Sequence, residues 1–522
     1  MRTMLTACTC LAVLGLSAYL GGSSPEGAVK FRLRCVDATT GKAVGGMVRI
    51  KEADTGQPLK LPGLLDRLRG FKVADSCQGW HVVPVDGGEI ALPRQRLHLE
   101  GLHGVETAQV KQDLDLRKTI PSEVVVKLPF LFRPETLGLV AGNTHLHLRD
   151  MSRAEADEYL RTIPAADGLK VMFISYLERH LDDRSYVSNG YPAGDLKDLA
   201  GSGVVFANGE EYRHNLEGFG QGYGHVMFLG IKQHVKPASL GPGITKSGND
   251  DRPLRPGIDD ARKQGGTIVW CHNTFGYENV PNMLSGRLDA LNVFDGSRGD
   301  TYDDLYYRFL NIGLRVPLST GTDWFLFDFS RVYVGLRGAV TTAAWLSALK
   351  RGETVASNGP LLTLKIEGKT PGAVLDLKEP RKLRIEATAI GRLNFDKLQL
   401  VRNGKVVHAE NVMASQGGFT ARMEREVDID GPAWFAVRID STRKNEFDQK
   451  LYAHTSPVFV DVAGRRVFDV EAARVLLRLL EEAVANIRPR GQFSSPAARD
   501  QLLALYDQAT ADLRERINRR GH

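Results

Sequence analysis

The sequence predicts an α/β core with a β-rich segment on either side and a helical tail. Three observations support this: apolar runs separated by helix-length polar stretches in mid-chain, short alternating segments on either side, and two amphipathic patterns at the end. A hydrophobic content of 42% with 25% charged residues is typical of globular proteins and excludes collagen-like and disordered classes. A net charge of +6 spread over 522 residues produces only a weak electrostatic field, so we expect no nucleic-acid partner.

Residues 1–24 have the layout of a secretory signal peptide. Arg2 precedes an apolar stretch from Leu5 to Leu20, and small residues from Gly21 to Ser24 follow it. A membrane anchor is the alternative, but the stretch is shorter than the roughly 20 apolar residues that span a bilayer. We therefore expect export to the periplasm or the extracellular space, with no stable membrane span after cleavage.

Residues 25–133 are expected to form an N-terminal β domain. Alternating segments such as Lys30–Val36 and Ser122–Leu128 predict a small antiparallel sandwich. Cys35 and Cys77 both fall in this segment. An oxidising compartment permits a bridge between them, and two separate buried thiols fit equally well.

Residues 134–360 show a different rhythm, with apolar runs separated by helix-length polar stretches. Such runs are typical of buried parallel strands in an α/β sheet or barrel. They comprise Leu169–Ile174, Gly203–Phe206, Gly266–Trp270 and Leu314–Leu318. Cys271 follows one of these runs, and we expect it to pack in the core rather than act as a nucleophile.

Residues 361–465 alternate again and predict a second β domain, in which Asn403-Gly404 is a hairpin signal between two strands. Residues 466–522 predict a helical hairpin, with Ser495 as N-cap and Pro496 as the first residue of its second helix. The predicted inner faces consist of Val470, Ala473, Leu477, Leu480, Val484 and Ile487 in the first helix and Leu502, Leu505, Ala509, Leu513 and Ile517 in the second.

Candidate metal ligands gather in the central segment. His145 and His147 are two residues apart, so on a strand their side chains share one face and can share one cation. Taken alone, two histidines at this spacing are more often unrelated surface residues than a metal site. Further candidates lie next to predicted strands: Glu210, Glu211, His225, His272 and Asp323. Imidazoles with carboxylates suit zinc, manganese or iron.

Adjacent residues of a strand point to opposite faces, so at most one of Glu210 and Glu211 faces the site. His225 and His272 each lie beside an apolar run, and taken singly they also fit hydrogen-bonded core histidines. His214 and His234 have no motif partner and are expected to be structural or rim residues. Asp150 is expected to be a solvated loop residue.

These residues resemble the polymerase-and-histidinol-phosphatase (PHP) superfamily, and within it the carbaryl-hydrolase-like CehA/McbA family. The likeness covers roughly residues 28–460. It rests on His145-Leu-His147, Gly209-Glu-Glu211, Gly224-His225, His272-Asn273, Gly321-Thr-Asp323 and Ser357-Asn-Gly-Pro360. The resemblance implies a distorted (β/α)7 barrel, flanked by two β-sandwich-like domains, with the metal cluster at the mouth formed by the carboxyl ends of the strands.

The chain departs from the family pattern at three places. The aspartate expected before the first histidine is Asn143 or Thr144. The Thr-Asp-His motif is replaced by Ser175-Tyr-Leu-Glu-Arg-His180, and the final Asp-x-His reads Asp323-Trp-Phe325. These departures favour two metal ions over three.

The resemblance also implies roles for individual residues. His145, His147 and Asp323 would hold one ion, His225 and His272 the other, and the spacing of the family's Gly-x-Glu selects Glu211 as the bridging carboxylate. His180 is a further ligand or the acid that protonates the leaving group, and Arg213 is a candidate substrate contact. A phosphate substrate would require converging cations, for which Arg213, Arg331 and Lys232 are available.

We therefore expect an exported, metal-dependent hydrolase that acts on a small-molecule ester, amide, carbamate or phosphoester. Divalent cations acidify a bound water and stabilise the developing oxyanion in such reactions. The alternative is a secreted carbohydrate- or surface-binding protein whose site has lost catalysis. The two are distinguished by metal content and chelator-sensitive turnover.

Overall fold

The computed structural model of the chain describes residues 28–520, apart from 70–73, 179–184, 200, 202, 218–221, 246, 296–301 and 303–304. The predicted leader, residues 1–24, and His180 lie outside the described residues. The described chain is a mixed α/β structure with several sheets, and strands outweigh helices at 37% against 24%.

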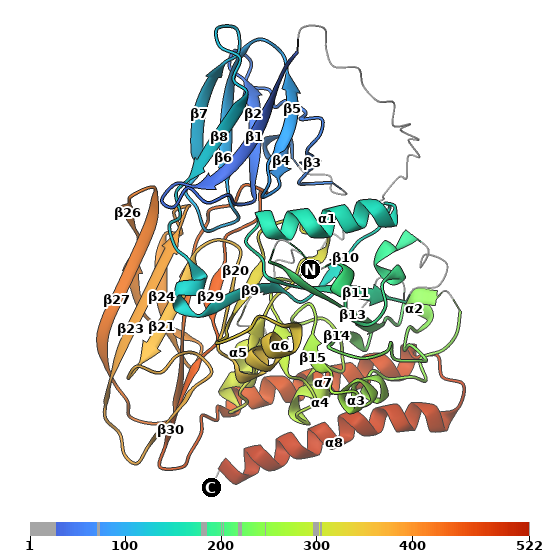
Figure 1. The fold of residues 1–522 in the computed structure, drawn as a ribbon. Helices are drawn as coiled ribbons and strands as arrows, with labels where there is room; N and C mark the ends of the chain where they lie inside the picture. The colour runs from blue at the N-terminus through green and yellow to red at the C-terminus, as the bar shows by residue number, and fades with distance from the viewer. Residues whose placement is uncertain are drawn as a thin grey trace, which may run out of the picture.

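The N-terminal strands form two sheets packed face to face at the top of Figure 1. Exposed and buried residues alternate along β1 (Val29–Asp37), as expected for a strand with one face against a core. One sheet consists of β1, β5 (Gly88–Leu92) and β8 (Glu123–Leu128). The expectation of a wholly antiparallel sandwich was wrong here, because β1 and β8 pair parallel. The other consists of β2 (Gly46–Glu52), β3 (Leu65–Asp66), β4 (Trp80–Val83), β6 (Arg96–Leu102) and β7 (Val110–Asp115). Cys35 and Cys77 are separate buried thiols rather than a bridge.

A large curled sheet occupies the centre of the chain. Its strands, in spatial order, are β17 (Leu318–Ser319), β16 (Ala290–Asn292), β15 (Thr267–Trp270), β14 (Gly224–Leu229), β13 (Val205–His214), β11 (Val171–Leu177), β9 (Leu139–Asn143), β19 (Arg331–Gly335) and β20 (Thr354–Ser357). The short strand β12 (Gly194–Asp195) pairs with β13. Strands β9, β11 and β13 are parallel, as are β15, β16 and β17.

Three strands, β12, β14 and β19, depart from the parallel pattern that the sequence suggested. Strand β12 runs antiparallel to β13, and β19 runs antiparallel to β9 and β20. Strand β14 runs antiparallel to both β13 and β15. Its register places His225 opposite Arg213 on β13. The carboxyl end of β13 and the amino end of β14 therefore lie side by side, and both carry candidate site residues.

The sheet curls towards a barrel, and within the described residues no backbone pairing closes it. The edge strand β17 meets β20 through side chains: the Thr354 hydroxyl donates to the Leu318 carbonyl at 2.7 Å, and the Leu318 amide donates to Ser456 Oγ at 2.8 Å. Helices surround it, comprising α1 (Arg153–Ala166), α2 (Pro242–Thr245), α3 (Arg255–Lys263), α4 (Asn279–Leu284), α5 (Tyr306–Asn311) and α6 (Thr342–Arg351). Helix α1 lies between the N-terminal strands and this sheet (Figure 1).

The same sheet continues into the C-terminal β segment, past the boundary expected at residue 360. It runs from β20 through β29 (Ala453–Thr455), β28 (Ala433–Asp440) and β24 (Lys397–Arg402) to β25 (Lys405–Asn411), while β30 (Val458–Val462) pairs with β28 and β22 (Val374–Leu377) pairs with β30. A four-stranded sheet faces it, made of β21 (Leu361–Ile366), β23 (Lys382–Gly391), β27 (Gly418–Asp428) and β26 (Met413–Ser415). Asn403 and Gly404 turn the β24–β25 hairpin with positive φ, as predicted.

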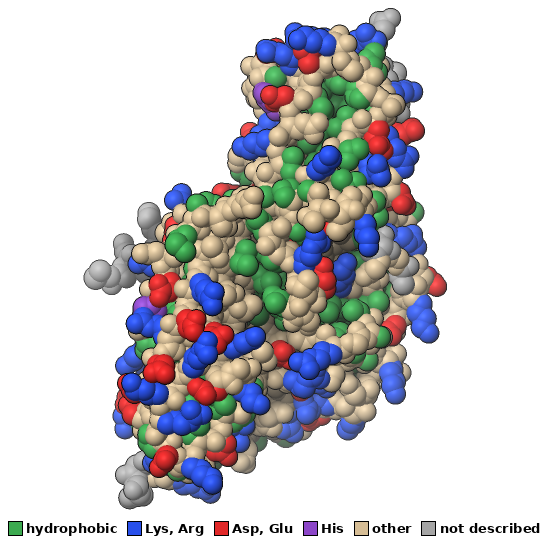
Figure 2. Space-filling view, turned by 60° about the vertical axis from the view of Figure 1, so that its left-hand side comes forward, with side chains coloured by type: hydrophobic (Ala, Val, Ile, Leu, Met, Phe, Trp, Pro, Cys, Tyr) green, Lys and Arg blue, Asp and Glu red, His purple; other side chains and the backbone are tan. Residues whose placement is uncertain are grey.

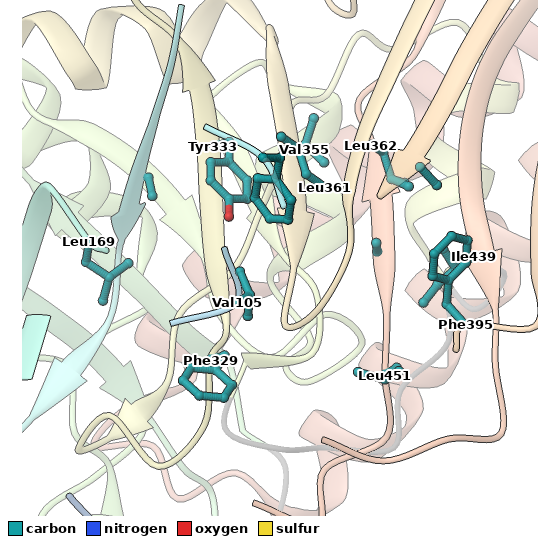
Figure 3. Packing of buried hydrophobic residues seen from close by; sticks show 14 of the residues in the cluster. Val105, Leu169, Phe329, Tyr333, Val355, Leu361, Leu362, Phe395, Ile439 and Leu451 are labelled. Atoms are coloured by element: carbon teal, nitrogen blue, oxygen red, sulfur yellow. The ribbon is translucent and has the colours of Figure 1, made fainter. Parts of the chain in front are cut away.

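A single hydrophobic cluster joins all three β regions. Val105 comes from the N-terminal segment, Tyr333 from β19 and Leu362 from β21, and all three are buried in one cluster (Figure 3). The N-terminal and C-terminal segments are therefore packed onto the central sheet and are not loosely tethered modules.

The tail forms the helical hairpin that the sequence predicted. Helices α7 (Val470–Arg490) and α8 (Pro496–Arg520) pack against each other and against α4 and α5, at the bottom of Figure 1. Ser495 accepts a hydrogen bond from the Ala498 amide and so caps α8. None of the helices in the described part of the chain combines the length and apolar character needed to cross a membrane.

Candidate metal centre

Backbone pairing brings the two histidines of His145-Leu-His147 next to Asp323. The short strand β10 (Leu146–His147) runs parallel to β18 (Asp323–Trp324), with Leu146 opposite Asp323. A Cβ on Gly321 would lie 2.5 Å from the Cβ of His145, so only glycine permits this approach. These pairings set the spacing of the first ligands.

Four ligand atoms converge at this point. His147 Nε2 lies 2.9 Å from His145 Nε2 and 2.8 Å from Glu211 Oε2. His145 Nε2 lies 3.5 Å from Glu211 Oε2, and Asp323 Oδ1 lies 3.5 and 3.6 Å from the two imidazoles. Ligands about 2.1 Å from one zinc ion lie roughly 3.0–3.5 Å apart. The observed separations of 2.8–3.6 Å lie within about 0.2 Å of that range, so these atoms could hold one ion after a small adjustment.

The protonation pattern of the two rings also suits a cation. His147 Nδ1 donates to the Ser175 carbonyl at 3.0 Å, and His145 Nδ1 donates to Asp295 Oδ2 at 2.8 Å. Each ring therefore directs its Nε2 at the other and at Glu211. Burial lowers the pKa of His145, but Asp295 outweighs burial and raises that pKa well above its ordinary value. Two imidazole nitrogens and a carboxylate oxygen this close to one another require a positive charge between them, which a proton on His145 or a metal ion supplies.

A second group forms around the other oxygen of Glu211. His225 Nδ1 lies 2.9 Å from Glu211 Oε1, and His272 Nε2 lies 3.9 Å from the same oxygen. His225 Nε2 donates to Asn215 Oδ1 at 2.9 Å, so Nδ1 is the ring nitrogen that faces Glu211. The two oxygens of Glu211 thus face two separate groups of histidines, as in a carboxylate that bridges two ions.

Glu210 points to the opposite face of β13, as the alternation of strand side chains requires. Its carboxylate accepts a hydrogen bond from the Val235 amide at 2.7 Å and lies 3.8 Å from His234. Glu211 is the member of the pair that joins the cluster.

The backbone is held in unusual conformations beside the ligands. His272 has φ of 55°, Asn273 of 45° and Asp323 of 63°, all in the left-handed region that non-glycine residues rarely occupy. Strain of this kind, of order 1–3 kcal/mol per residue, persists where the surrounding structure holds it and is concentrated at functional sites.

Burial and mutual contact shift the acidities of the cluster. Burial lowers the pKa of His272 to about 3, so this imidazole is neutral and available as a ligand. Burial raises the pKa of Asp323 to about 7, and the nearby Glu211 carboxylate adds to the shift. Burial also raises the pKa of Glu211, but His225 and Arg213 outweigh burial and hold that pKa well below its ordinary value.

Arg213 is the candidate substrate contact that lies beside the cluster. It is two residues from Glu211 on β13 and therefore on the same face, and its charge acts on both Glu211 and Asp323. In the described part of the chain its Nε has no hydrogen-bond partner. A guanidinium so placed can bind an oxygen of a substrate.

The other proposed cations do not converge on the site. Arg331 is fully buried and donates to the carbonyls of Phe329 and Asp167. Lys232 is exposed in the loop after β14. His214 is stacked on Tyr223, with Nε2 2.9 Å from Asp250, and has a structural role.

The departures from the family motif have structural explanations. Asn143 accepts a hydrogen bond from the His145 amide at 3.0 Å and donates to the Thr322 hydroxyl at 2.9 Å, so it ties the two ligand segments together. Phe325, in the place of the last family histidine, is buried against Tyr159 and offers no ligand atom.

Asp295 is the member of the site that sequence reasoning missed. Its Oδ2 accepts from His145 Nδ1 and from Asn292 Nδ2 at 3.0 Å, and with Cys271 and His145 it forms a third compact group of donor atoms. The mostly apolar run Ala290–Phe294 just before Asp295 predicts a buried strand. Functional residues often follow the carboxyl ends of parallel strands, so this run could have identified Asp295 as a candidate.

No protein-family model matches the chain, and neither a curated protein nor a solved structure shows detectable similarity to it.

Proposed function

We propose that the protein is an exported, divalent-metal-dependent hydrolase of the PHP type. The single observation that carries this proposal is the placement of Glu211, whose two carboxylate oxygens face two separate groups of buried imidazoles. His145, His147 and Asp323 with Oε2 form the first ion site, and His225 and His272 with Oε1 form the second.

Zinc, manganese or iron would bind this set of nitrogen and oxygen ligands. Divalent cations held there supply Lewis acidity and lower the pKa of a water molecule from about 15.7 towards 7.

The protein's own side chains would hold the ions, orient the substrate and protonate the leaving group. Asp323 has a pKa of about 7 in the metal-free protein, and a divalent cation bound beside it would hold it as the carboxylate that serves as ligand. Arg213 orients a substrate oxygen and neutralises charge that develops on it. One such guanidinium suits a neutral ester, amide or carbamate better than a phosphomonoester, which requires several converging cations. His180, outside the described residues, remains a candidate acid for the leaving group.

Metal content tests the proposal directly. We expect about two equivalents of metal per chain after purification without chelator, and loss of both in His145→Ala because the two sites share Glu211. His98→Ala is the matched control, since His98 is an exposed histidine of the N-terminal sheet. Removal of the metal with a chelator should abolish turnover of esters, amides or phosphodiesters, and added zinc or manganese should restore it. Less than about a tenth of an equivalent, even after incubation with these metals, would contradict the assignment and favour a binding protein.

A further inference from the structure

A cavity of about 720 Å³ lies where the N-terminal strands meet the large sheet. This volume falls within the roughly 300–1,000 Å³ that small-molecule sites occupy. The cavity borders the start of β9 at Leu139–Ala141, whereas the metal cluster follows the carboxyl end of the same strand. It is therefore separate from the site described above.

The floor of this cavity contains two acceptors without a donor between them. His103 Nδ1 donates to the Gly45 carbonyl at 2.7 Å, so its Nε2 carries a lone pair. That nitrogen lies 3.8 Å from Glu106 Oε2. Within the described part of the chain, the Glu106 carboxylate accepts no hydrogen bond, and its nearest cation is Arg331 Nη1 at 3.9 Å.

These two acceptors are buried, at 5% exposure for Glu106 and 7% for His103. Burial raises the pKa of Glu106 to about 7 and lowers that of His103 to about 4. Arg331 is the main charge that lowers the pKa of Glu106, but it makes no hydrogen bond to this carboxylate and donates instead to two backbone carbonyls. A buried carboxylate without a donor costs free energy that a ligand carrying N–H groups would recover.

The walls are apolar and extend to the surface. Phe130, Leu139, Val140 and Val340 line the cavity, and Val340 is 36% exposed. Leu137, close by in the chain, is 53% exposed. Hydrophobic side chains gather on this face of the molecule where the N-terminal part meets the body (Figure 2). A bare inorganic cation or a water molecule would leave the apolar walls exposed to solvent, whereas a hydrocarbon chain would bury their surface.

The charges around the cavity favour a cation at its floor. Arg133 lines the cavity but is paired with Asp37 at 2.7 Å and stacked over Phe130. Lys170 is exposed at the rim, where Asp86 and Glu135 offset its charge. An anion that reached the floor would face the lone pairs of Glu106 and His103, with the nearest guanidinium, Arg331, behind Glu106 at 3.9 Å.

We propose that this cavity binds a primary organic ammonium ion, which donates to Glu106 and His103 and lays its hydrocarbon chain against Phe130 and Val140. An ammonium group offers three donors and a charge opposite to that of the carboxylate. No metal ligand takes part, so this proposal and the proposed hydrolase activity can fail independently.

Isothermal titration calorimetry near pH 8 tests this with three probes of equal chain length: hexylammonium, hexan-1-ol and hexanoate. We expect hexylammonium to bind at least about tenfold more tightly than the other two. Glu106→Gln should weaken it at least about tenfold. Glu135→Gln, which removes the same charge at the exposed rim, should change the affinity less than about threefold.

A second variant covers the case in which Glu106→Gln does not fold. Val340→Trp alters only an exposed rim position, so it should leave the melting temperature unchanged while the larger side chain blocks the entrance and removes binding. Equal affinity for hexanol and hexylammonium, tighter binding of hexanoate, or unchanged affinity in Glu106→Gln would each overturn the proposal, as would the absence of binding heat in the wild-type protein.

Discussion

Asp295 orients His145, one of the candidate metal ligands, through the ring nitrogen that faces away from Glu211. Its carboxylate holds the Nδ1–H of His145, which sets the ring orientation and turns Nε2 towards His147 and Glu211. Carboxylates in this position orient the histidine and raise its basicity. The Asn292 amide fixes the carboxylate in turn.

We expect Asp295→Leu to weaken metal binding roughly 10- to 100-fold, because His145 loses the partner that fixes its tautomer. Asp295→Asn keeps an acceptor for Nδ1–H and should lose less. A zinc competition titration against a chromophoric chelator measures both. Asp113→Asn, in the exposed N-terminal sheet, is the control. Wild-type zinc affinity in Asp295→Leu would show that Asp295 has no part in positioning His145.

At the scale of elements, α3 depends on a tertiary contact for its first turn. Leu254, at the N-cap position, provides no side-chain cap. Instead Glu278, from the segment before α4, accepts the amides of Leu254 at 2.8 Å and Arg255 at 3.1 Å. The orphan donors of a helix start are thus satisfied by a residue distant in sequence.

Burial raises the pKa of Glu278 from 4.5 to about 7, which makes stability depend on pH. Between these values the folded protein holds a proton that the unfolded chain has released, so stability falls as pH rises from about 4.5 to 7 and then levels off. Glu278→Gln does not titrate. We expect the stability of the wild type relative to this variant to fall by on the order of 3 kcal/mol across that window.

Thermal unfolding of both proteins at intervals between about pH 4.5 and 8 measures this difference. Glu426→Gln, on the exposed strand β27, is the control and should follow the wild-type profile. Parallel profiles for the wild type and Glu278→Gln would show that Glu278 does not titrate in this range.

At the scale of the whole molecule, a buried ion pair joins the N-terminal strands to the centre. Arg67 Nη2 lies 2.5 Å from Asp167 Oδ2, at the end of α1, and both side chains are at most 1% exposed. The same guanidinium donates to the carbonyls of Leu326 and Asp328, in the segment that follows Asp323. The position of the N-terminal sheets is therefore coupled to the backbone near the metal centre.

We expect Arg67→Met to destabilise the protein by roughly 3–5 kcal/mol, because Asp167 would be left as an unpaired buried charge. The double variant with Asp167→Leu should recover part of this loss. Arg96→Met breaks an exposed pair with Asp54 and should cost less than about 0.5 kcal/mol. Thermal unfolding distinguishes them, and a loss in Arg67→Met no larger than in Arg96→Met would contradict the prediction.

Local patterns were sufficient for much of the architecture. Strand alternation predicted the N-terminal sheets, Asn403-Gly404 predicted a hairpin, and helical periodicity with Ser495-Pro496 predicted the tail. They could not predict that β14 runs antiparallel or that one sheet continues past residue 360. Strand direction and sheet membership depend on pairing between distant segments, which periodicity does not encode.

The sequence by itself determined which side chains were available for metal binding: two histidines on one strand face, a single glutamate on the inner face of its strand, and further histidines beside apolar runs. Only the tertiary structure decided that Glu211 faces two groups with its two oxygens, and that Asp295 supports His145. The physical reason is that ligand geometry and desolvation arise when distant strands pair and exclude water, and neither exists in the unfolded chain.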